Sequence, residues 1–144
     1  MSDAIRVLLV DDEEDFTEAV GFWLTSRGHT VSKARDGEQA LNYLYRREEY
    51  ERRPGGDPIL ILLDLKMPKV NGIEVLKEMK ADIRLRNIPV VVVTSSRENP
   101  DIRKCYELGV NAYVVKPVDF REFTEAIRNV GLFWVLINQL PEKA

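Results

Sequence analysis

Carboxylates follow two apolar runs in this sequence, at the points where buried strands are predicted to end. Residues 6–10 and 59–63 are rich in Val, Leu and Ile, which is typical of strands covered on both faces in a parallel sheet. Asp11 and Asp12 follow the first run, and Asp64 follows the second. Because ligands bind at the carboxyl edge of such sheets, we expect the three acids to share one site. Adjacent carboxylates repel one another, and a hard divalent cation such as Mg²⁺ relieves that repulsion.

A hydroxyl and an ammonium group end two further apolar runs. Residues 89–94 close on Thr94, and residues 112–117 carry Lys116 near their end. Lysine can balance the charge of a phosphoryl group, threonine can donate a hydrogen bond to it, and a carboxylate can attack phosphorus as a nucleophile. We therefore predict phosphoryl transfer onto Asp64, a reaction in which catalysis is mainly alignment and charge neutralisation.

The elements that must position these groups alternate along the chain. Apolar residues at helical spacing follow the predicted strands, as Phe16, Val20 and Leu24 follow the first. Parallel crossovers are right-handed almost without exception, so five such units predict a three-layer α/β fold: a flavodoxin-like (βα)5 doubly wound parallel sheet with strand order 2-1-3-4-5. The predicted strands are 6–10, 30–34, 59–63, 89–94 and 112–117, and the predicted helices are 14–26, 38–50, 74–81, 100–108 and about 119–140.

Size and charge narrow the class of protein. The 144 residues, 44% of them hydrophobic, suffice for one compact domain with a single core. A net charge of −3 argues against nucleic acid as a partner, and no apolar run reaches the roughly 20 residues of a membrane-spanning helix. The single cysteine, Cys105, cannot form an internal disulfide, and the first residues do not resemble a signal peptide, so we expect a cytoplasmic protein.

Four motifs at the predicted strand ends resemble, in order and spacing, the receiver domain of two-component response regulators. Each motif alone is a weak match, but their joint occurrence is specific, and the resemblance covers nearly the whole chain. The motifs are Val10-Asp11-Asp12, Leu63-Asp64-Leu65-Lys66-Met67-Pro68 with Asn71-Gly72, Val93-Thr94-Ser95, and Tyr113-Val114-Val115-Lys116-Pro117.

The resemblance implies a site for Mg²⁺ and a phosphoryl group. Asp64 would accept the phosphoryl group from the phosphohistidine of a sensor histidine kinase. Asp12, Asp64 and the backbone carbonyl of Lys66 would bind Mg²⁺, and Asp11 would assist through a water bound to the ion. Lys66 and Ser96, each two positions beyond a motif residue, would flank the site and tune the lifetime of the phosphoryl group.

The resemblance also implies a conformational switch. Thr94 and Lys116 would contact the phosphoryl group, and Thr94 would move toward it while Tyr113 turns inward. That change would alter the face made by the fourth helix, the fifth strand and the fifth helix, which passes on the signal. The bond between Lys116 and Pro117 would be cis. Such a chain catalyses its own phosphorylation and slow dephosphorylation, but it is a signalling protein and not a conventional enzyme.

The C-terminal residues extend the last predicted helix beyond what one core can cover. Leu132, Phe133 and Leu136 lie outside the inward stripe of that helix, so they predict a contact surface. This ending resembles the stand-alone receivers that partner phytochrome-type sensor kinases, many of which form homodimers. We therefore predict a single receiver domain over residues 1–144, with a tail that either closes a homodimer or docks a different protein.

Two alternative functions stay open from the sequence. A degenerate receiver would act as a constitutive docking module, but its usual signature is loss of an acid, the threonine or the lysine, and this chain retains them all. An enzyme on the same architecture, such as a phosphatase or a nucleotide binder, would need features that the sequence lacks. It has no Walker loop and no G-x-G-x-x-G after the first strand, and Lys66 stands where the second acid of an aspartyl phosphatase would lie.

Overall fold

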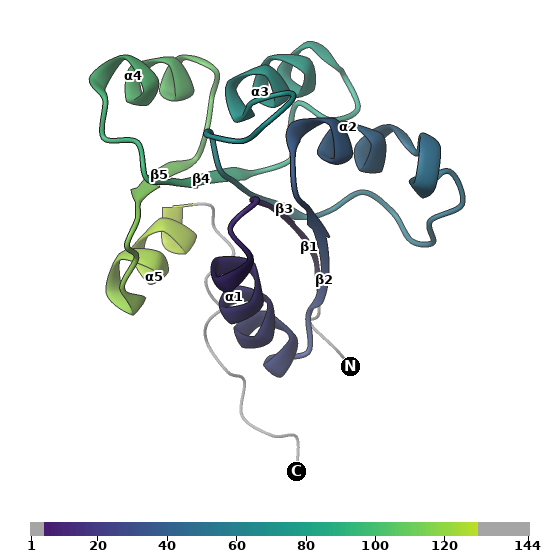
Figure 1. The fold of residues 1–144 in the computed structure, drawn as a ribbon, viewed down its shortest axis with the longest axis horizontal. Helices are drawn as coiled ribbons and strands as arrows, with labels where there is room; N and C mark the ends of the chain where they lie inside the picture. Colours follow the sequence, from purple (N-terminus) through teal and green to yellow (C-terminus); the bar gives the residue numbers. More distant parts are fainter. Residues whose placement is uncertain (1–4, 130–144) are drawn as a thin grey trace.

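The computed structural model describes residues 5–129, which form a five-stranded parallel sheet between two layers of helices (Figure 1). The strand order is β2-β1-β3-β4-β5, which confirms the predicted flavodoxin-like fold. In this order the carboxyl ends of β1 and β3 are neighbours, and β4 and β5 follow on the same side. The strands are β1 (Arg6–Val10), β2 (Thr30–Ala34), β3 (Leu60–Leu63), β4 (Val90–Thr94) and β5 (Ala112–Val115).

Helices lie on both faces of the sheet. Two of them, α1 and α5, cover one face, and α2, α3 and α4 cover the other (Figure 1). Of the helices within residues 5–129, none is long and apolar enough to cross a membrane. The bounds are α1 (Glu14–Ser26), α2 (Gly37–Tyr45), α3 (Gly72–Ala81), α4 (Asn99–Glu107) and α5 (Phe120–Asn129).

The sheet divides the apolar core into two parts because successive side chains of a strand point to opposite faces. Leu8, Ile61 and Val92 pack toward α2, α3 and α4, whereas Leu9 and Leu62 pack toward α1 and α5. Both sets are buried, which explains why the strands are continuously apolar instead of alternating. The central strands are therefore packed on both faces, and this packing fixes the backbone positions of the residues that directly follow them.

The second helix is shorter than the sequence predicted. Instead of continuing to Tyr50, α2 ends at Tyr45, because Arg46 adopts a left-handed backbone conformation with φ of 55°. A short 3-10 helix, η1 (Glu48–Tyr50), follows. The amide of Arg46 still donates to the carbonyl of Tyr43, which closes the helix in the usual way for a left-handed cap.

Arginine side chains order the polar connection between α2 and β3. Arg53 stacks on the ring of Tyr43 at 3.9 Å and donates to its carbonyl at 2.7 Å. Arg84, from the segment after α3, donates to both carboxylate oxygens of Asp57 at 2.7 and 2.9 Å and to the carbonyl of Leu44 at 2.7 Å. These contacts join the connection to carbonyls in the last turn of α2, so it is fixed although its sequence is rich in turn-forming residues.

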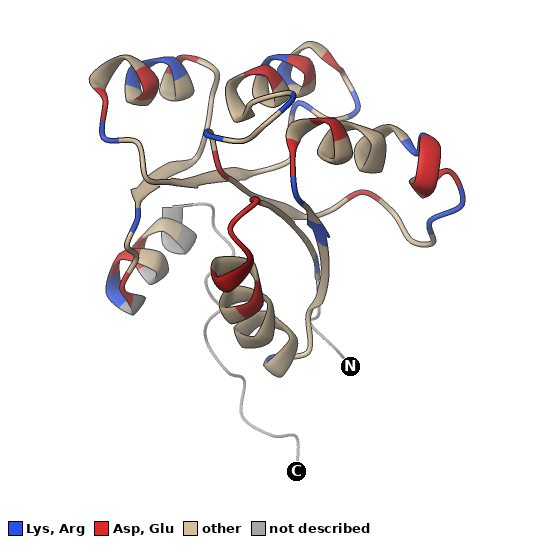
Figure 2. Cartoon of the chain, viewed as in Figure 1, with Lys and Arg blue, Asp and Glu red and all other residues tan. Residues whose placement is uncertain are grey.

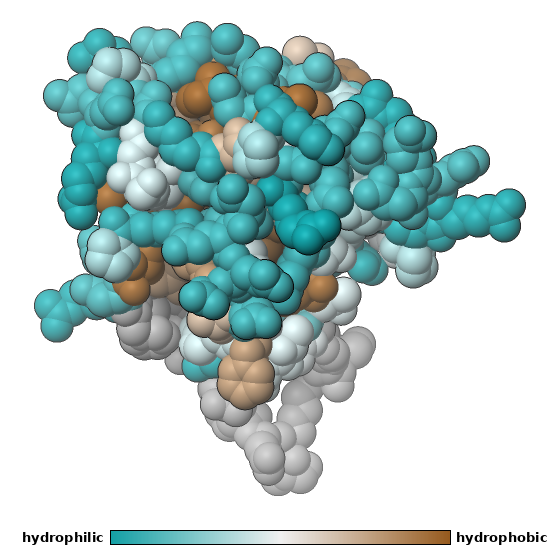
Figure 3. All heavy atoms as spheres, in the orientation of Figure 1, coloured by the Kyte–Doolittle hydropathy of each residue, from teal (hydrophilic) through white to brown (hydrophobic). Residues whose placement is uncertain are grey.

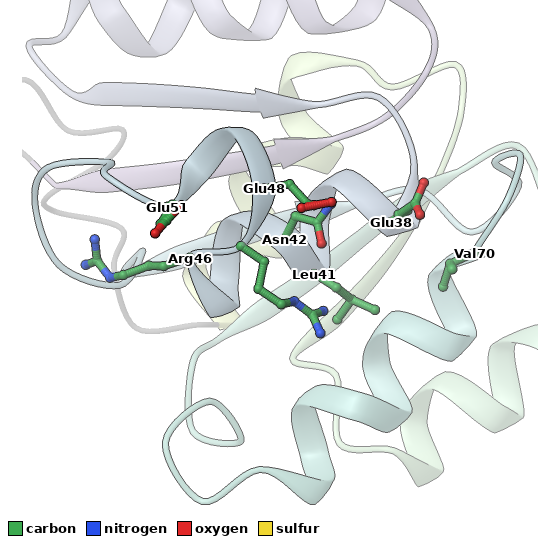
Figure 4. A pocket seen from close by; sticks show the side chains of 8 residues that line it. Glu38, Leu41, Asn42, Arg46, Glu48, Glu51 and Val70 are labelled. Carbon is green, nitrogen blue, oxygen red and sulfur yellow. The ribbon is translucent and has the colours of Figure 1, made fainter.

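A cavity of about 640 Å³ lies beside this connection, between α2, η1 and Val70 of the loop that leads to α3 (Figure 4). Its walls are mostly charged, with a small apolar contribution from Leu41 and Val70. The lining residues are Glu38, Leu41, Asn42, Arg46, Arg47, Glu48, Glu51 and Val70. Both non-glycine residues with a left-handed backbone in this connection, Arg46 and Glu48, belong to the lining.

The exposed apolar side chains are scattered over the described surface. The face seen in Figure 3 is mainly hydrophilic, with small separate apolar areas. Ile59, predicted to start a buried strand, is 45% exposed because β3 begins one residue later. Phe22 on α1 is 75% exposed.

His29 and Cys105 are buried and have structural roles. His29 is buried, and its Nδ1 accepts a hydrogen bond from the amide of Ile5 at 3.2 Å. Cys105 is fully buried on α4, and burial raises the pKa of its thiol to about 11. A thiol with that pKa remains protonated at neutral pH, so it is not an activated nucleophile.

Gly37 begins α2 at a point where the backbone of the β3–α3 loop passes very close. A Cβ atom at this position would lie 2.0 Å from the carbonyl oxygen of Val70, which is backbone and cannot rotate away. We expect Gly37→Ala to lower the free energy of unfolding by about 1–3 kcal/mol through overpacking. Urea denaturation of the purified protein measures this change.

Gly56 provides the matched control, because no described heavy atom lies within 4 Å of a Cβ placed there. Gly56→Ala should change the free energy of unfolding by less than about 1 kcal/mol, in the stabilising direction if the backbone accepts alanine. Equal losses in the two variants would show that the close approach at Gly37 is not what limits substitution.

Candidate functional site

Three carboxylates meet at the carboxyl edge of the central strands. Asp11 and Asp64 continue the ladder by one residue beyond β1 and β3, and the amide of Asp64 donates to the carbonyl of Val10 at 2.9 Å. Each of Asp11, Asp12 and Asp64 places an oxygen within 4.8 Å of the other two. Asp11 and Asp64 are only 3% and 6% exposed, whereas Asp12 faces solvent. Figure 2 shows this acidic group where the loops after β1 and β3 lie side by side.

Lys116 supplies the positive charge of the site. Its Nζ lies 2.8 Å from Oδ2 of Asp11 and 2.7 Å from Oε1 of Glu13, so one ammonium bridges two acids. Burial lowers the pKa of Lys116, but the hydrogen bonds to Asp11 and Glu13 raise it by more, and the net shift is upward. The ammonium is therefore charged at every physiological pH.

Asp11 is in a less favourable position than a carboxylate usually occupies. Burial raises its pKa, the hydrogen bonds from Lys116 and from the amide of Glu13 lower it, and the charge of Asp64 raises it again, with a net upward shift. Removal from water and repulsion by a neighbouring carboxylate both disfavour the ionised form. A bound cation would reverse that balance.

Thr94 and Lys116 are joined through the backbone. Thr94 ends β4 and is fully buried, and its carbonyl accepts a hydrogen bond from the amide of Lys116 at 2.8 Å. The peptide bond between Lys116 and Pro117 is cis. Tyr113 is half-buried on β5, and its hydroxyl donates to the carbonyl of Ser96 at 3.0 Å. The hydroxyl of Tyr113 is thus attached to the loop that follows Thr94.

Lys66 and Ser96 flank the site and share a partner on α4. The amide of Lys66 donates to Oδ1 of Asp64 at 3.3 Å, and its Nζ lies 3.6 Å from Oδ2 of Asp101. The same oxygen of Asp101 accepts a hydrogen bond from the hydroxyl of Ser96 at 2.5 Å.

Two of these acids were not expected from the sequence. Glu13 and Asp101 each lie close to the start of a helix, where a carboxylate is commonly favoured by the helix dipole alone. The one available signal for Glu13 was its place in an unbroken run of five acids, residues 11–15. Nothing in the sequence pattern indicates the contacts of Asp101.

The donor set suits a hard divalent cation and a phosphoryl group. Asp11, Asp12 and Asp64 offer oxygen ligands only, which is the chemistry that Mg²⁺ prefers. A neighbouring cavity of about 520 Å³ is lined in part by Glu13, Ser95 and Lys116, so the ammonium is reachable from outside. The arrangement can hold a cation on the acids and balance an incoming anion with Lys116.

The family model described as the response regulator receiver domain matches residues 7–128. The chain belongs to the response regulator receiver family. Receivers of this family are phosphorylated by histidine kinases and bind Mg²⁺. The match confirms the family predicted from the four motifs, and it does not favour the docking-module alternative.

Several curated relatives and solved structures are response regulators of similar length. Response regulator Rcp1 of Synechocystis sp. is 37% identical over 137 residues, which are 94% of this chain and 92% of Rcp1. The bacteriophytochrome response regulator AtBRR is 50% identical, with a TM-score of 0.80 over 94% of this chain and 98% of that structure.

Two solved structures show receivers of this kind with a metal or a phosphoryl group. The Mn²⁺-bound form of Rcp1 is 36% identical to this chain, with a TM-score of 0.78 over 96% of this chain and 99% of Rcp1. The phosphorylated cyanobacterial phytochrome response regulator RcpA is 35% identical, with a TM-score of 0.79 over the same shares of the two chains. Receivers associated with phytochromes are therefore among the close relatives of this receiver, as the sequence predicted.

The predicted contact residues Leu132, Phe133 and Leu136 lie outside the described residues. So does the part of the predicted 119–140 helix beyond Asn129.

We expect Mg²⁺ to increase the free energy of unfolding, because the three acids come together only in the folded chain. At a concentration 100 times the dissociation constant, the increase should be about 2.7 kcal/mol. Asp12→Asn removes one ligand charge without disturbing the buried acids, so its Mg²⁺-dependent increase should be smaller. Urea denaturation with Mg²⁺ or with EDTA measures both.

The control is Glu78→Gln, which removes a carboxylate from the exposed face of α3. This variant should keep the full response to Mg²⁺. If Asp12→Asn also kept the full response, the cation would be binding somewhere other than the acidic group.

Proposed function

We propose that Asp64 accepts a phosphoryl group from the phosphohistidine of a sensor histidine kinase in a Mg²⁺-dependent reaction. The observation that carries this proposal is the meeting of Asp11, Asp12 and Asp64 at one sheet edge with the ammonium of Lys116 bonded to Asp11. A carboxylate oxygen of Asp64 attacks phosphorus, the bond from phosphorus to the histidine nitrogen breaks, and the imidazole leaves as the neutral base after taking a proton.

The other residues neutralise charge and orient the phosphoryl group. Asp12, Asp64 and the backbone carbonyl of Lys66 hold Mg²⁺, with Asp11 assisting through a water. When bound, the ion would supply positive charge that offsets the repulsion between the acids and the phosphoryl oxygens. Lys116 exchanges its bond to Asp11 for a phosphoryl oxygen.

The readout of phosphorylation is a change in the face made by α4, β5 and α5. Thr94 moves toward the phosphoryl group and donates its hydroxyl, and Tyr113 turns inward into the space that Thr94 leaves. In the structure the hydroxyl of Tyr113 donates to the carbonyl of Ser96, two residues after Thr94. The side chain of Tyr113 is therefore attached to the loop that directly follows Thr94. A two-state element of this kind can be biased by a single charged group.

We also propose that the kinase is of the phytochrome type. The support is the similarity to AtBRR and RcpA, whose names associate them with a bacteriophytochrome and a cyanobacterial phytochrome. Sensor kinases take their phosphoryl groups from cytoplasmic ATP, so the proposal places this chain in the cytoplasm. Its downstream partner is a protein, without a role for nucleic acid or membrane.

The direct test is intact-protein mass after incubation with Mg²⁺ and acetyl phosphate. The wild type should gain one phosphoryl group that hydroxylamine removes, because an acyl phosphate is susceptible to that nucleophile. Asp64→Asn and a sample without Mg²⁺ should gain none. If rapid quenching revealed no adduct on the wild type, the chain would be a docking module.

The kinase type is tested by phosphotransfer from purified, autophosphorylated kinases. A phytochrome-type kinase should transfer at a higher initial rate than a kinase with an unrelated sensor, and Asp64→Asn should accept from neither. Equal rates from the two kinases would remove the phytochrome part of the proposal and leave the phosphoacceptor part intact.

We propose that the apolar residues after Asn129 close a homodimer. The support is the sequence alone. Leu132, Phe133 and Leu136 add apolar side chains beyond those that one domain core can cover. Leu132→Glu/Phe133→Glu should be monomeric by size-exclusion chromatography with light scattering, whereas Phe22→Glu, a change at an exposed aromatic on α1, should remain dimeric. A dimer that persists in the tail variant would contradict this interface.

A further inference from the structure

Helix α4 is the most weakly embedded of the helices around the site. Among its described residues only Cys105 is fully buried, and the side chain of Glu98, which precedes the helix, makes no capping hydrogen bond to the described backbone. Burial of apolar side chains is the usual source of helix stability in a domain, so α4 depends more than its neighbours on polar contacts. Those contacts lie at its first turn.

Asp101 makes the polar contacts of that turn. Its Oδ2 accepts a hydrogen bond from the hydroxyl of Ser96 at 2.5 Å and lies 3.6 Å from the Nζ of Lys66. Ser96 is on the loop after β4, and Lys66 is on the loop after β3, so one carboxylate oxygen connects α4 to both loops beside Asp64 and Thr94. The hydroxyl oxygen of Ser96 also accepts a hydrogen bond from the amide of Glu98 at 3.4 Å.

We propose that Asp101 is a positioning residue that ties the first turn of α4 to Ser96 and Lys66, and that phosphorylation of Asp64 releases this tie. The inference rests on the proposed function. It assigns to α4 a specific restraint in the unphosphorylated state. One carboxylate holds this restraint, and the restraint is lost when Asp64 carries a phosphoryl group.

Two consequences of phosphorylation act on the same carboxylate. A phosphoryl group brings about −1.5 to −2 of charge to a site two residues from Lys66, so it competes with Asp101 for the ammonium. Movement of Thr94 toward the phosphoryl group pulls on the loop that carries Ser96, which stretches the second bond. Because both partners leave the same oxygen, the turn loses both attachments together.

A simpler explanation for Asp101 is charge at a helix amino terminus, which is favourable without any partner. The double variant separates the two explanations, because Ser96→Ala by itself also removes the acceptor of the Glu98 amide at the start of α4. If Asp101 acted through the dipole alone, the effects of Ser96→Ala and Asp101→Asn on α4 would add. If Asp101 holds the loop, Ser96→Ala and Asp101→Asn should act in the same direction and be less than additive when combined.

The experiment follows two readouts in wild type, Ser96→Ala, Asp101→Asn and the double variant. The first is hydrogen–deuterium exchange of the first turns of α4, residues 99–104, in the free protein. The second is the initial rate of phosphorylation by acetyl phosphate with Mg²⁺. Glu107→Gln, at the other end of the same helix, is the control.

Each single variant should exchange about fivefold faster in α4 than the wild type, and Glu107→Gln should match the wild type. Phosphorylation should also be about threefold to tenfold faster, because a larger fraction of molecules already has the released arrangement. Wild type treated with Mg²⁺ and beryllofluoride, a phosphoryl mimic, should approach the exchange of the free variants.

Unchanged exchange in Ser96→Ala and Asp101→Asn would overturn the tie itself. Faster exchange without faster phosphorylation would overturn its release by the phosphoryl group. If the wild type took no phosphoryl group at all, the proposed function would fail, and exchange in the free variants would still decide whether Asp101 holds the helix.

Discussion

Repulsion among carboxylates at one edge of a parallel sheet is the constraint on which this structure depends. Asp11 and Asp64 are placed side by side because β1 and β3 are neighbours, and both are largely removed from water. Such an arrangement costs free energy unless positive charge is supplied. Lys116, the residue after β5, supplies part of it, and its nearest acids are Asp11 and Glu13. The remaining negative charge is the basis on which we propose that the site binds a cation and, together with that cation, a phosphoryl group.

The rest of the fold keeps these charges in place. Apolar layers on both faces fix β1 and β3, and the residues that follow these strands can move little. Helix α4 differs, since it contributes one fully buried side chain and is attached by polar contacts among its described residues. The molecule thus combines a rigid acidic edge with a neighbouring element that a small change in charge can move. That combination is what a phosphorylation switch requires.

Strand order and the positions of the acids could be predicted from the sequence because they follow from simple patterns. Apolar runs that end on Asp11, Asp64 and Thr94 locate the sheet edge, and the alternation of strands with helices orders it. The end of α2 could not be predicted in this way. Residues 46–50 are compatible with a helix, but Arg46 turns left-handed where its side chain reaches the carbonyls of Arg53 and Gly55. That contact depends on the path of a loop, which local propensity does not encode.

Asp101, the partner of Lys66, and Glu13, the second partner of Lys116, were inaccessible to sequence reasoning for a related reason. Glu13 and Asp101 have types and positions that helix starts commonly show, so their identity carries no information about a site. What distinguishes them is that the long side chains of Lys66 and Lys116 reach them, and those contacts are seen only in the folded structure. The sequence therefore indicated the groups that we propose to react, and the structure added Glu13 and Asp101 beside them.

The most direct measurement of the central claim is the chemical location of the phosphoryl group. Reduction of the phosphorylated protein with borohydride converts an aspartyl phosphate to homoserine, which peptide sequencing by mass spectrometry assigns to one position. The account predicts homoserine at Asp64 alone, formed only when Mg²⁺ was present during phosphorylation. Homoserine at Asp11 or Asp12, or formation that does not depend on Mg²⁺, would contradict it.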